Sequence, residues 1–456
     1  MVKAMKSSLE RFIASHPGSG VLTERAFKVS RGLHTDAIFT LPPYVYITRA
    51  KGSRKWDVDG NEYIDYVMGF GALLLRHAHP AMVAAVKEQI EKGTHYGAEN
   101  ELEIEWAELI CRLIPAAEKV EFVLSGTEAN MTIASLARAF TGRGKILKFA
   151  EQYFGWAGDL LPGIAPPYDR PFAGQIPPVS DDAVSGGTVV IPCNDGAAME
   201  KALAKGDIAA LFIEGGGANC GRIGQPPELV YTARRLTHKY GTLLVIDEVI
   251  SGFRWSPGGY QAALGVTPDL TPLAKLNGGG MPGGAAVCGR ADVMALLHLK
   301  PGDAEWNRHR HVVHRGTWNG NPVTAAAAVA VLNIAARGEV QKHAESMAER
   351  LVGGVNREIE KRGIEACAHN STSVVHIFIG KCRKCDRSIC LDAAKSMPPE
   401  LAHVLNRHLL LNGVSLHRGV MGLVSAAHTA GDIDQTIEAF GAAFDGMLAE
   451  GIIIRA

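Results

Sequence analysis

One stretch near the middle of the chain, residues 245–284, constrains most strongly what this sequence can fold into. It begins within a short run of apolar and β-branched side chains, residues 242–246, that leads directly to Asp247. Such a run is typical of a buried parallel strand, and its last residues lie at the carboxyl edge of the sheet, where open α/β sheets bind ligands. Lys275 follows later, close to a run of three glycines. The pattern predicts a lysine on a tight loop rather than on a solvated helix face.

A carboxylate and a lysine amine are the two groups that a pyridine-type aldehyde cofactor needs. The carboxylate keeps the ring nitrogen protonated, so that the ring accepts electrons, and the amine holds the aldehyde as a Schiff base. Taken singly, Asp247 would more simply be a helix cap and Lys275 a surface residue. Together, and with a phosphate motif in the same chain, the two residues favour a site for pyridoxal phosphate.

Three stretches, IDEVISGFR, PDLTPLAK and GGGMPGGA, resemble the class III pyridoxal-phosphate aminotransferases and are most similar to the branch typified by glutamate-1-semialdehyde aminomutase. The resemblance covers nearly the whole chain from the first hairpin. It implies the α/β architecture of fold type I, with a large domain on a mostly parallel sheet and a smaller α+β domain at the carboxyl end. A chain of 456 residues also exceeds the size at which a single core keeps growing.

Three parts are expected along the chain. An amino-terminal segment of helices and a small hairpin sheet covers residues 1–75, the large cofactor-binding domain covers 76–337, and the small domain covers 338–456. Short apolar runs predict strands at 44–47, 55–58, 63–66, 120–124, 145–149, 189–192, 209–212, 242–246 and 374–379. Helical spacing predicts helices that begin at Pro80 and that cover 103–114 and 399–412.

Charge and cysteine content argue against several classes of protein. The 47 Lys and Arg residues balance the 47 Asp and Glu residues, so nothing favours nucleic acid or an anionic membrane as a partner. The amino terminus lacks a central apolar run, so neither a signal peptide nor a membrane anchor is expected. The eight scattered cysteines favour the cytoplasm. Zinc ribbons repeat the Cys-x-x-Cys pair and this chain does not, so no metal is expected at Cys382, Cys385 and Cys390.

A phosphate-binding loop is predicted directly after the strand at 120–124. There Ser125 and Glu128 have the spacing of a capping box ahead of a helical pattern. A helix amino terminus offers unpaired amides and a positive dipole end to a phosphate, Gly126 permits close approach of the anion, and Thr127 adds a hydroxyl. A capping box alone is usually only a cap, but SGTEAN is also how the resembled family writes its phosphate loop.

The resemblance implies further cofactor contacts. In EQYFGW the first aromatic, Tyr153, would stack on the cofactor ring, and Phe154 replaces the histidine that usually follows. In EGGGANCG, Asn219 would contact the phenolic oxygen, and Gly215 replaces a usual proline, which predicts a more pliable loop. Val249 is also expected among the cofactor contacts.

Two other segments imply a shared site and a closing loop. The motif GTWNGNP matches the family motif in which a threonine, here Thr317, binds the phosphate of the neighbouring subunit, so a homodimer with shared active sites is expected. Residues 162–187 are rich in Pro, Gly and Asp, which is typical of a long functional loop. In the resembled branch the corresponding loop closes over the site.

Substrate choice depends on arginines. In the aminomutase branch an arginine before the first hairpin binds the substrate carboxylate, and alignment puts Ile38 at that position, which argues against glutamate-1-semialdehyde as the substrate. Arg418 lies near the place where some transaminases of the branch present another carboxylate-binding arginine. A surface arginine is an equal alternative there.

The sequence therefore predicts an aminotransferase that moves an amino group from an amine or amino acid donor to a keto or aldehyde acceptor. Lys275 would form the Schiff base and then carry the proton as general base and acid, while Asp247 maintains the electron sink. An aminomutase or amino acid racemase is the first alternative, and a relative that binds the cofactor without catalysis is the second. A dinucleotide site at the Gly-x-Gly-x-x-Gly match, 278–283, is a weak alternative, because Pro282 interrupts it and no convincing strand precedes it.

Overall fold

The computed structural model describes residues 7–30, 44–163, 187–380 and 397–455. The chain forms two compact units: Pro80–Gly338 make up one, and the flanking portions, Met1–His79 and Glu339–Ala456, together make up the other. The predicted division into three parts stays a prediction. Ile38, the cysteine cluster and almost all of the predicted closing loop fall outside the described residues.

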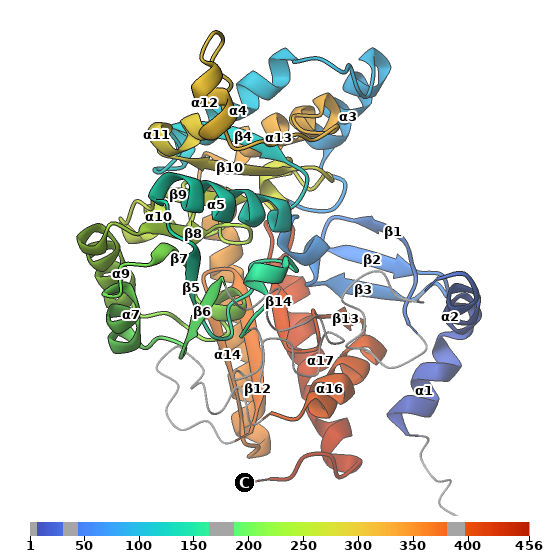
Figure 1. The fold of residues 1–456 in the computed structure, drawn as a ribbon. Coiled ribbons are helices and arrows are strands. Elements are labelled where there is room, and N and C mark those ends of the chain that lie inside the picture. Colours follow the sequence, from blue (N-terminus) through green and yellow to red (C-terminus); the bar gives the residue numbers. More distant parts are fainter. Residues whose placement is uncertain (1–6, 31–43, 164–186, 381–396, 456) are drawn as a thin grey trace, which may run out of the picture. The chain divides into compact units, whose positions relative to one another are not determined.

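A mixed sheet forms the centre of the unit Pro80–Gly338 (Figure 1). In the described residues it has seven strands in the order β4-β10-β9-β8-β7-β5-β6, and only β10 runs antiparallel to its neighbours. The mostly parallel sheet that the sequence implied is therefore confirmed. Its strands are β4 (Lys119–Val123), β5 (Lys145–Phe149), β6 (Thr188–Ile191), β7 (Ile208–Glu214), β8 (Leu243–Asp247), β9 (Leu270–Leu273) and β10 (Ala285–Gly289).

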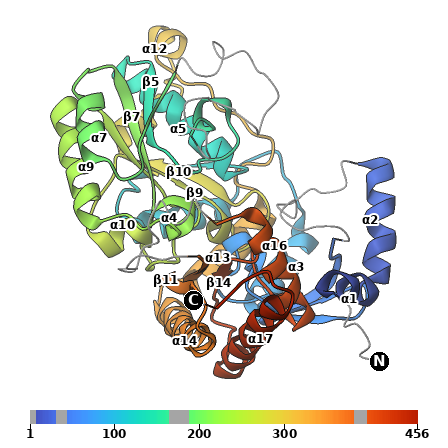
Figure 2. The ribbon, with the colours of Figure 1, turned by 90° about the horizontal axis from the view of Figure 1, so that it is seen from below.

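Helices cover both faces of this sheet, with α5 (Gly126–Thr141) on one side and α7 (Gly196–Leu203) and α9 (Pro227–Tyr240) on the other (Figure 2). Side chains alternate accordingly: Phe212 packs in the core beneath α5, and Leu211 packs in the core beneath α7 and α9. Because both faces are buried, the central strands are continuously apolar. The unit also contains α3 (Pro80–Lys92), α4 (Glu101–Leu113), α8 (Ala218–Gly221), α10 (Gly259–Leu264), α11 (Ala291–Met294), α12 (Ala304–His309), α13 (Pro322–Ala335) and the 3-10 turns η3 (Gly158–Leu160), η4 (Lys275–Gly278) and η5 (Ala295–Leu297).

The second unit contains two small sheets. One joins the amino-terminal strands β1 (Ile47–Lys51), β2 (Arg54–Asp57) and β3 (Glu62–Asp65) to β13 (Val414–Ser415), which pairs parallel with β3. The other is antiparallel and consists of β11 (Ala366–Ser371), β12 (Val374–Ile379) and β14 (Met421–Leu423). Its helices are α1 (Ser8–Ser15), α2 (Pro17–Val29), α14 (Glu339–Arg362), α16 (Pro399–Leu411), α17 (Ala430–Ala449) and the turn η2 (Met68–Gly71).

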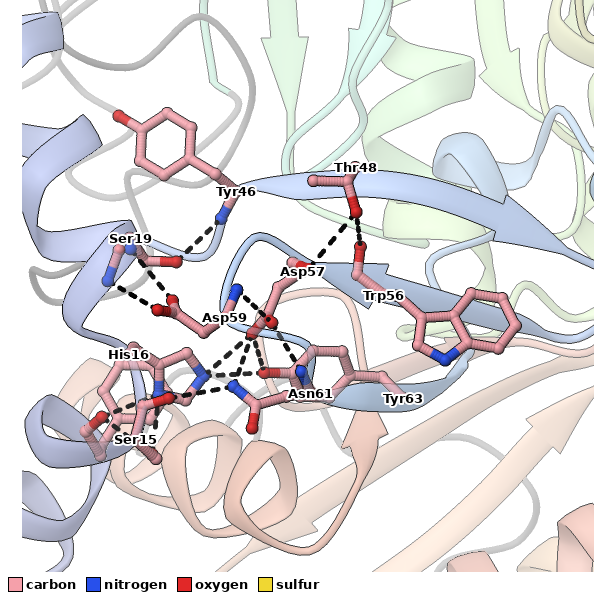
Figure 3. Close-up of polar contacts among 12 residues, drawn as sticks. Ser15, His16, Ser19, Tyr46, Thr48, Trp56, Asp57, Asp59, Asn61 and Tyr63 are labelled. Carbon is pink, nitrogen blue, oxygen red and sulfur yellow. Dashed lines mark hydrogen bonds and ion pairs between the residues drawn. The ribbon is translucent and has the colours of Figure 1, made fainter.

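Buried hydrogen bonds attach the amino-terminal helices to the hairpin (Figure 3). The Tyr63 hydroxyl donates to Asp57 at 2.6 Å and lies 2.7 Å from Nε2 of His16. Burial and the Asp57 carboxylate raise the pKa of Tyr63, so the phenol remains a donor. The carboxylate of Asp59, in the turn between β2 and β3, accepts the backbone N–H of Gly18 at 2.6 Å. An acid at the amino terminus of α2 is favourable for the helix dipole.

Neither a membrane-crossing helix nor a metal-ligand cluster occurs in the described part of the chain. No single helix there is long and apolar enough to span a bilayer, and α13 and α14 reach that threshold only when they are counted together across the break between them. No group of three or more His, Cys, Asp or Glu side chains gathers there as a metal ion would require.

Candidate active site

Two buried carboxyl groups lie next to each other at the carboxyl edge of the central sheet. Glu214 ends β7, Asp247 ends β8, and the two residues are register partners in the parallel ladder. Burial raises the pKa of Asp247 to about 6 and the pKa of Glu214 to about 7, and the charge of Asp247 adds to the shift at Glu214. Because a buried acid is costly unless it is paired, two neighbouring acids indicate a functional site at this edge.

Three groups favour the ionised form of Asp247 against this burial. The side-chain amide of Asn130 donates to Oδ2 at 2.7 Å, and the backbone N–H of Val249 donates to Oδ1 at 2.8 Å. The positive charge of Lys275 also lowers the pKa of Asp247. The structure therefore brings together three residues that the sequence analysis predicted for the site, Asp247, Val249 and Lys275.

Lys275 begins η4, a single turn that follows β9. Its φ of 52° lies in the left-handed region, which costs a non-glycine residue roughly 1–3 kcal/mol. The side chain of Asn277 fixes the turn, since it accepts from Trp106 Nε1 at 3.3 Å and donates to the Gly284 carbonyl at 3.2 Å. Gly278 packs on the backbone of Gly284 so closely that a Cβ does not fit. These contacts agree with the prediction of a tight, glycine-walled loop.

The glycine run after Lys275 is not a dinucleotide fingerprint. The expectation that no strand precedes it is wrong, because β9 lies directly before η4. The next element is β10 rather than a helix, however, so no helix amino terminus faces a pyrophosphate at these glycines.

Gly215 is held more firmly than the sequence predicts. Its backbone N–H donates to the carbonyl of Asp247 at 2.8 Å and so extends the ladder between β7 and β8. A Cβ at this position would lie 2.9 Å from the same carbonyl oxygen and would also press on Ser251 Oγ. The expected pliable loop is therefore tightly packed at its first residue, and proline could not make this hydrogen bond.

The first turn of α5 forms a cradle beside Asp247. Ser125 is the N-cap and its hydroxyl accepts the N–H of Glu128 at 3.2 Å. The first amides of a helix have no intrahelical acceptor and can bind an anion. A Cβ at Gly126 would lie 2.9 Å from Val249 Cγ2, and a Cβ at Gly155 would lie 2.8 Å from the backbone of Thr127. Only glycines allow these chain segments to approach so closely, and Gly155 also has a φ of +89°.

The two aromatic residues of the EQYFGW motif separate in the structure. Tyr153 is 50% exposed, and its backbone N–H donates to Glu214 at 3.2 Å. Phe154 is buried and meets Phe212 edge-on at 5.6 Å between ring centroids. Where the family usually has a histidine, this chain therefore has a core side chain. The ammonium of buried Lys148 lies 5.1 Å from the Phe154 ring, and burial lowers the pKa of Lys148 to about 7.

The Glu214 carboxylate joins two loops of the site. It accepts the backbone N–H of Asn219 at 3.1 Å and of Cys220 at 2.7 Å, in addition to that of Tyr153. The side chain of Asn219 donates to the carbonyl of Glu151 at 3.1 Å. Asn219 is thus close to the loop that carries Tyr153, and its contact with the cofactor stays a prediction.

Two further predicted contacts are Thr317 and Arg418. Thr317 is exposed in the turn before α13. The segment before it is tied to the phosphate cradle by His314, whose Nδ1 lies 3.1 Å from Glu121 and whose Nε2 lies 4.0 Å from Glu128. Arg418 belongs to the other unit, where it has a φ of 52°, and its role toward substrate stays a prediction.

Sequence reasoning missed Asn130 and Gly155. Both occur inside motifs that were recognised, SGTEAN and EQYFG. The available signal for Asn130 was an amide side chain at a buried position of α5 next to the apolar residues Ile133, Ala134 and Ala137. Its partner Asp247 could not be inferred, because the contact depends on how α5 lies across β8.

Comparison with known proteins agrees with this geometry. Residues 39–366 match the family described as Aminotransferase class-III. A glutamate-1-semialdehyde 2,1-aminomutase from Brevibacillus brevis is 36% identical over 405 residues, which cover 87% of this chain and 90% of that protein.

Solved structures give the same result. An omega-transaminase from Sphaerobacter thermophilus has a TM-score of 0.84 at 29% identity and covers 95% of this chain and 99% of its own. A glutamate-1-semialdehyde aminomutase from Pseudomonas aeruginosa PAO1 has a TM-score of 0.86 at 25% identity, with coverage of 96% and 97%, and a variant of it is solved in complex with PMP. The chain therefore belongs to the class III aminotransferases, pyridoxal-phosphate-dependent enzymes of fold type I.

Proposed function

We propose that this enzyme transfers an amino group from an amine or amino acid to a keto or aldehyde acceptor, with Lys275 as the residue that binds the cofactor aldehyde. The observation that carries the proposal is the meeting of Asp247 and Lys275 at the carboxyl edge of the sheet. The hydrogen bonds from Asn130 and Val249 support an ionised Asp247 in a buried place. An acid in that state suits the protonated nitrogen of a pyridine ring.

The residues of the site fit pyridoxal phosphate. Ser125, Gly126 and Thr127 would hold the phosphate at the start of α5, where a Cβ at Gly126 would fill the cradle. Asp247 would hold the ring nitrogen. When bound, the cofactor supplies an electron sink for the carbon that loses its proton. The remaining proposed contacts are Tyr153, Asn219 and Val249.

Lys275 performs the proton transfers in this proposal. Its amine removes the proton from the substrate carbon that bears the amino group, and then returns a proton to complete the transfer, so it acts first as base and then as acid. The fixed turn around it supports this role, because Asn277 and the neighbouring glycines restrict the backbone position from which the Lys275 side chain extends. Pre-set geometry of this kind lowers the entropic part of the barrier.

An aminomutase remains the second candidate, because curated relatives named glutamate-1-semialdehyde 2,1-aminomutase are 36–37% identical to this chain. The replacement of the expected carboxylate-binding arginine by Ile38 favours transfer between different substrates instead. Ile38 lies outside the described residues, so this part of the proposal rests on sequence.

We propose further that the active form is a cytoplasmic homodimer in which Thr317 of each subunit contacts the phosphate held by its neighbour. Large apolar side chains are exposed on α5, just before it and around Thr317, as an interface between copies would require. They are Leu124, Met131, Val313 and Trp318. The cytoplasmic location is supported by the scattered cysteines.

Absorption spectroscopy tests the reaction type. The purified protein with added pyridoxal phosphate is mixed with single amines and amino acids in the absence of an acceptor. Loss of the visible cofactor band is the result expected of a transaminase, and the active donors identify the substrate class. A band that shifts without loss would favour the aminomutase or racemase, and the absence of any band would refute the assignment.

A further inference from the structure

Asn130 is a buried polar side chain on the face of α5 that packs against the sheet. Its neighbours on this face are apolar, among them Ala129, Ile133 and Ala134. Asn130 is only 1% exposed, and its Nδ2 donates to Asp247 Oδ2 at 2.7 Å. A helix that otherwise contributes core side chains thus places one amide on the acid of the site.

The oxygen of the Asn130 amide argues against a purely structural role for this side chain. The Oδ1 atom of Asn130 is buried and accepts no hydrogen bond from the described residues. A buried polar atom without a partner destabilises a fold, and an apolar side chain of similar volume would avoid that cost. The presence of asparagine at this position is therefore explained by what Nδ2 contacts, which is Asp247.

The placement of Asn130 connects the two halves of the cofactor site. The first turn of α5, at Ser125, Gly126 and Thr127, forms the phosphate cradle, and Asn130 follows on the same helix. We propose that Asn130 is a positioning residue: through Nδ2 it keeps Asp247 ionised and fixed in orientation toward the ring nitrogen, so that one helix sets both the phosphate contact and the ring contact. This inference rests on the proposed function, because it assigns Asp247 to the ring of pyridoxal phosphate.

The charges that act on Asp247 show why a neutral donor is useful there. Lys275 favours the ionised carboxylate, whereas Glu248 disfavours it. Glu214, its partner in the ladder, is a further acid whose charge is unfavourable to a second one nearby. The amide of Asn130 donates at every pH and does not depend on the state of Lys275. It therefore holds the acid in place while the lysine amine is engaged with cofactor or substrate.

Two substitutions separate the hydrogen bond from packing. Asn130→Leu keeps the number and branching of the side-chain heavy atoms but removes the donor, and Asn130→Asp supplies a donor only when one of the two carboxyl groups is protonated. The matched control is Thr132→Val on the same helix, because the Thr132 hydroxyl donates only to the local Glu128 carbonyl at 2.9 Å. Pyridoxal phosphate is titrated into each apoprotein, and apoprotein unfolding is followed in parallel.

A hydrogen bond to a charged group contributes enough that Asn130→Leu should weaken pyridoxal phosphate binding by about 10- to 100-fold. Its apoprotein should unfold at a temperature close to that of the wild type, since the removal of a buried unpaired oxygen offsets the loss of the donor to Asp247. Asn130→Asp should bind progressively more weakly as pH is raised from about 6 to about 9, because like charges then face each other. Thr132→Val should bind as the wild type does.

Wild-type affinity in Asn130→Leu, together with a flat pH profile in Asn130→Asp, would overturn this inference while the proposed function stands. If the wild type itself binds no pyridoxal phosphate, the proposed function fails first. Should Asn130→Leu not fold, Asn130→Ser replaces it, because a serine hydroxyl is too short to reach Asp247 and the same loss of affinity is expected.

Discussion

Replacement of Gly215 by proline tests how the carboxyl edge is built. The backbone N–H of Gly215 donates to the Asp247 carbonyl at 2.8 Å. Proline, which the resembled family usually carries here, has no N–H and would remove this donor, at a cost of about 1–3 kcal/mol for a buried carbonyl. The added Cβ would lie 2.9 Å from the same oxygen and press on Ser251, and such overpacking costs about 1–3 kcal/mol more.

Gly215→Pro should therefore lower the free energy of unfolding of the apoprotein by about 2–6 kcal/mol, which calorimetry of the apoprotein measures. It should also weaken pyridoxal phosphate binding, because the backbone of Asp247 is displaced. Gly215→Ala is the matched control: it keeps the N–H and adds only the Cβ, so about half of the loss is expected. Ser251→Ala in the Gly215→Ala background should recover part of that half, because the crowded Oγ is absent.

A Gly215→Pro protein with wild-type unfolding temperature and wild-type cofactor affinity would refute this account. Equal stability of Gly215→Ala and the double variant would refute only the steric effect assigned to Ser251. In that case the backbone carbonyl of Asp247, rather than Ser251, would be the group that excludes a Cβ.

Three further predictions concern single groups. Lys275→Ala should abolish turnover yet retain pyridoxal phosphate without a covalent bond, which absorption spectra and dialysis distinguish, and robust turnover would contradict the assignment. Burial raises the pKa of Asp247 from 3.8 to about 6, so ionising this carboxyl destabilises the folded apoprotein increasingly as the pH rises between these values. Asp247→Asn should therefore raise apoprotein stability by about 3 kcal/mol at neutral pH and leave it unchanged below about pH 4. Melting curves recorded across this pH range would report the difference, and the affinity for the cofactor should fall. Tyr63→Phe should cost about 1–3 kcal/mol in thermal unfolding, whereas Tyr46→Phe should be neutral, because the buried Tyr46 hydroxyl has no partner among the described residues.

The strands that the sequence predicted best are those whose burial is continuous. β5 and β12 have the predicted bounds, 145–149 and 374–379, because every residue but the first of β5 is buried. The first strand was predicted at 44–47 and lies instead at Ile47–Lys51, where the side chains are mostly exposed. Its place is set by pairing with β2 around the turn at Gly52 rather than by an apolar pattern.

Two features of the site could not be predicted from the sequence: which distant strands pair, and how α5 is rotated toward the sheet. β10 was not predicted, since its residues are small and show no alternation, yet it lies between β4 and β9. Asp247 was predicted because a strand delivers its last residue to a known edge. Asn130 was missed because its role depends on the rotation of α5 about its axis, which no local pattern of residues reports.

Backbone strain occurs at the same edge as the buried acids. Lys275, Asn219 and Glu151 are non-glycine residues with φ values of 52°, 52° and 69°, and each such residue costs about 1–3 kcal/mol. Selection for stability alone would remove both the strain and a buried carboxylate, so their coincidence indicates that the apolar core supports a binding arrangement. A cationic ring that pairs with Asp247 offsets part of this cost. Pyridoxal phosphate should consequently raise the unfolding temperature of the wild type more than that of Asp247→Asn, because only the wild type has a buried charge for the ligand to neutralise.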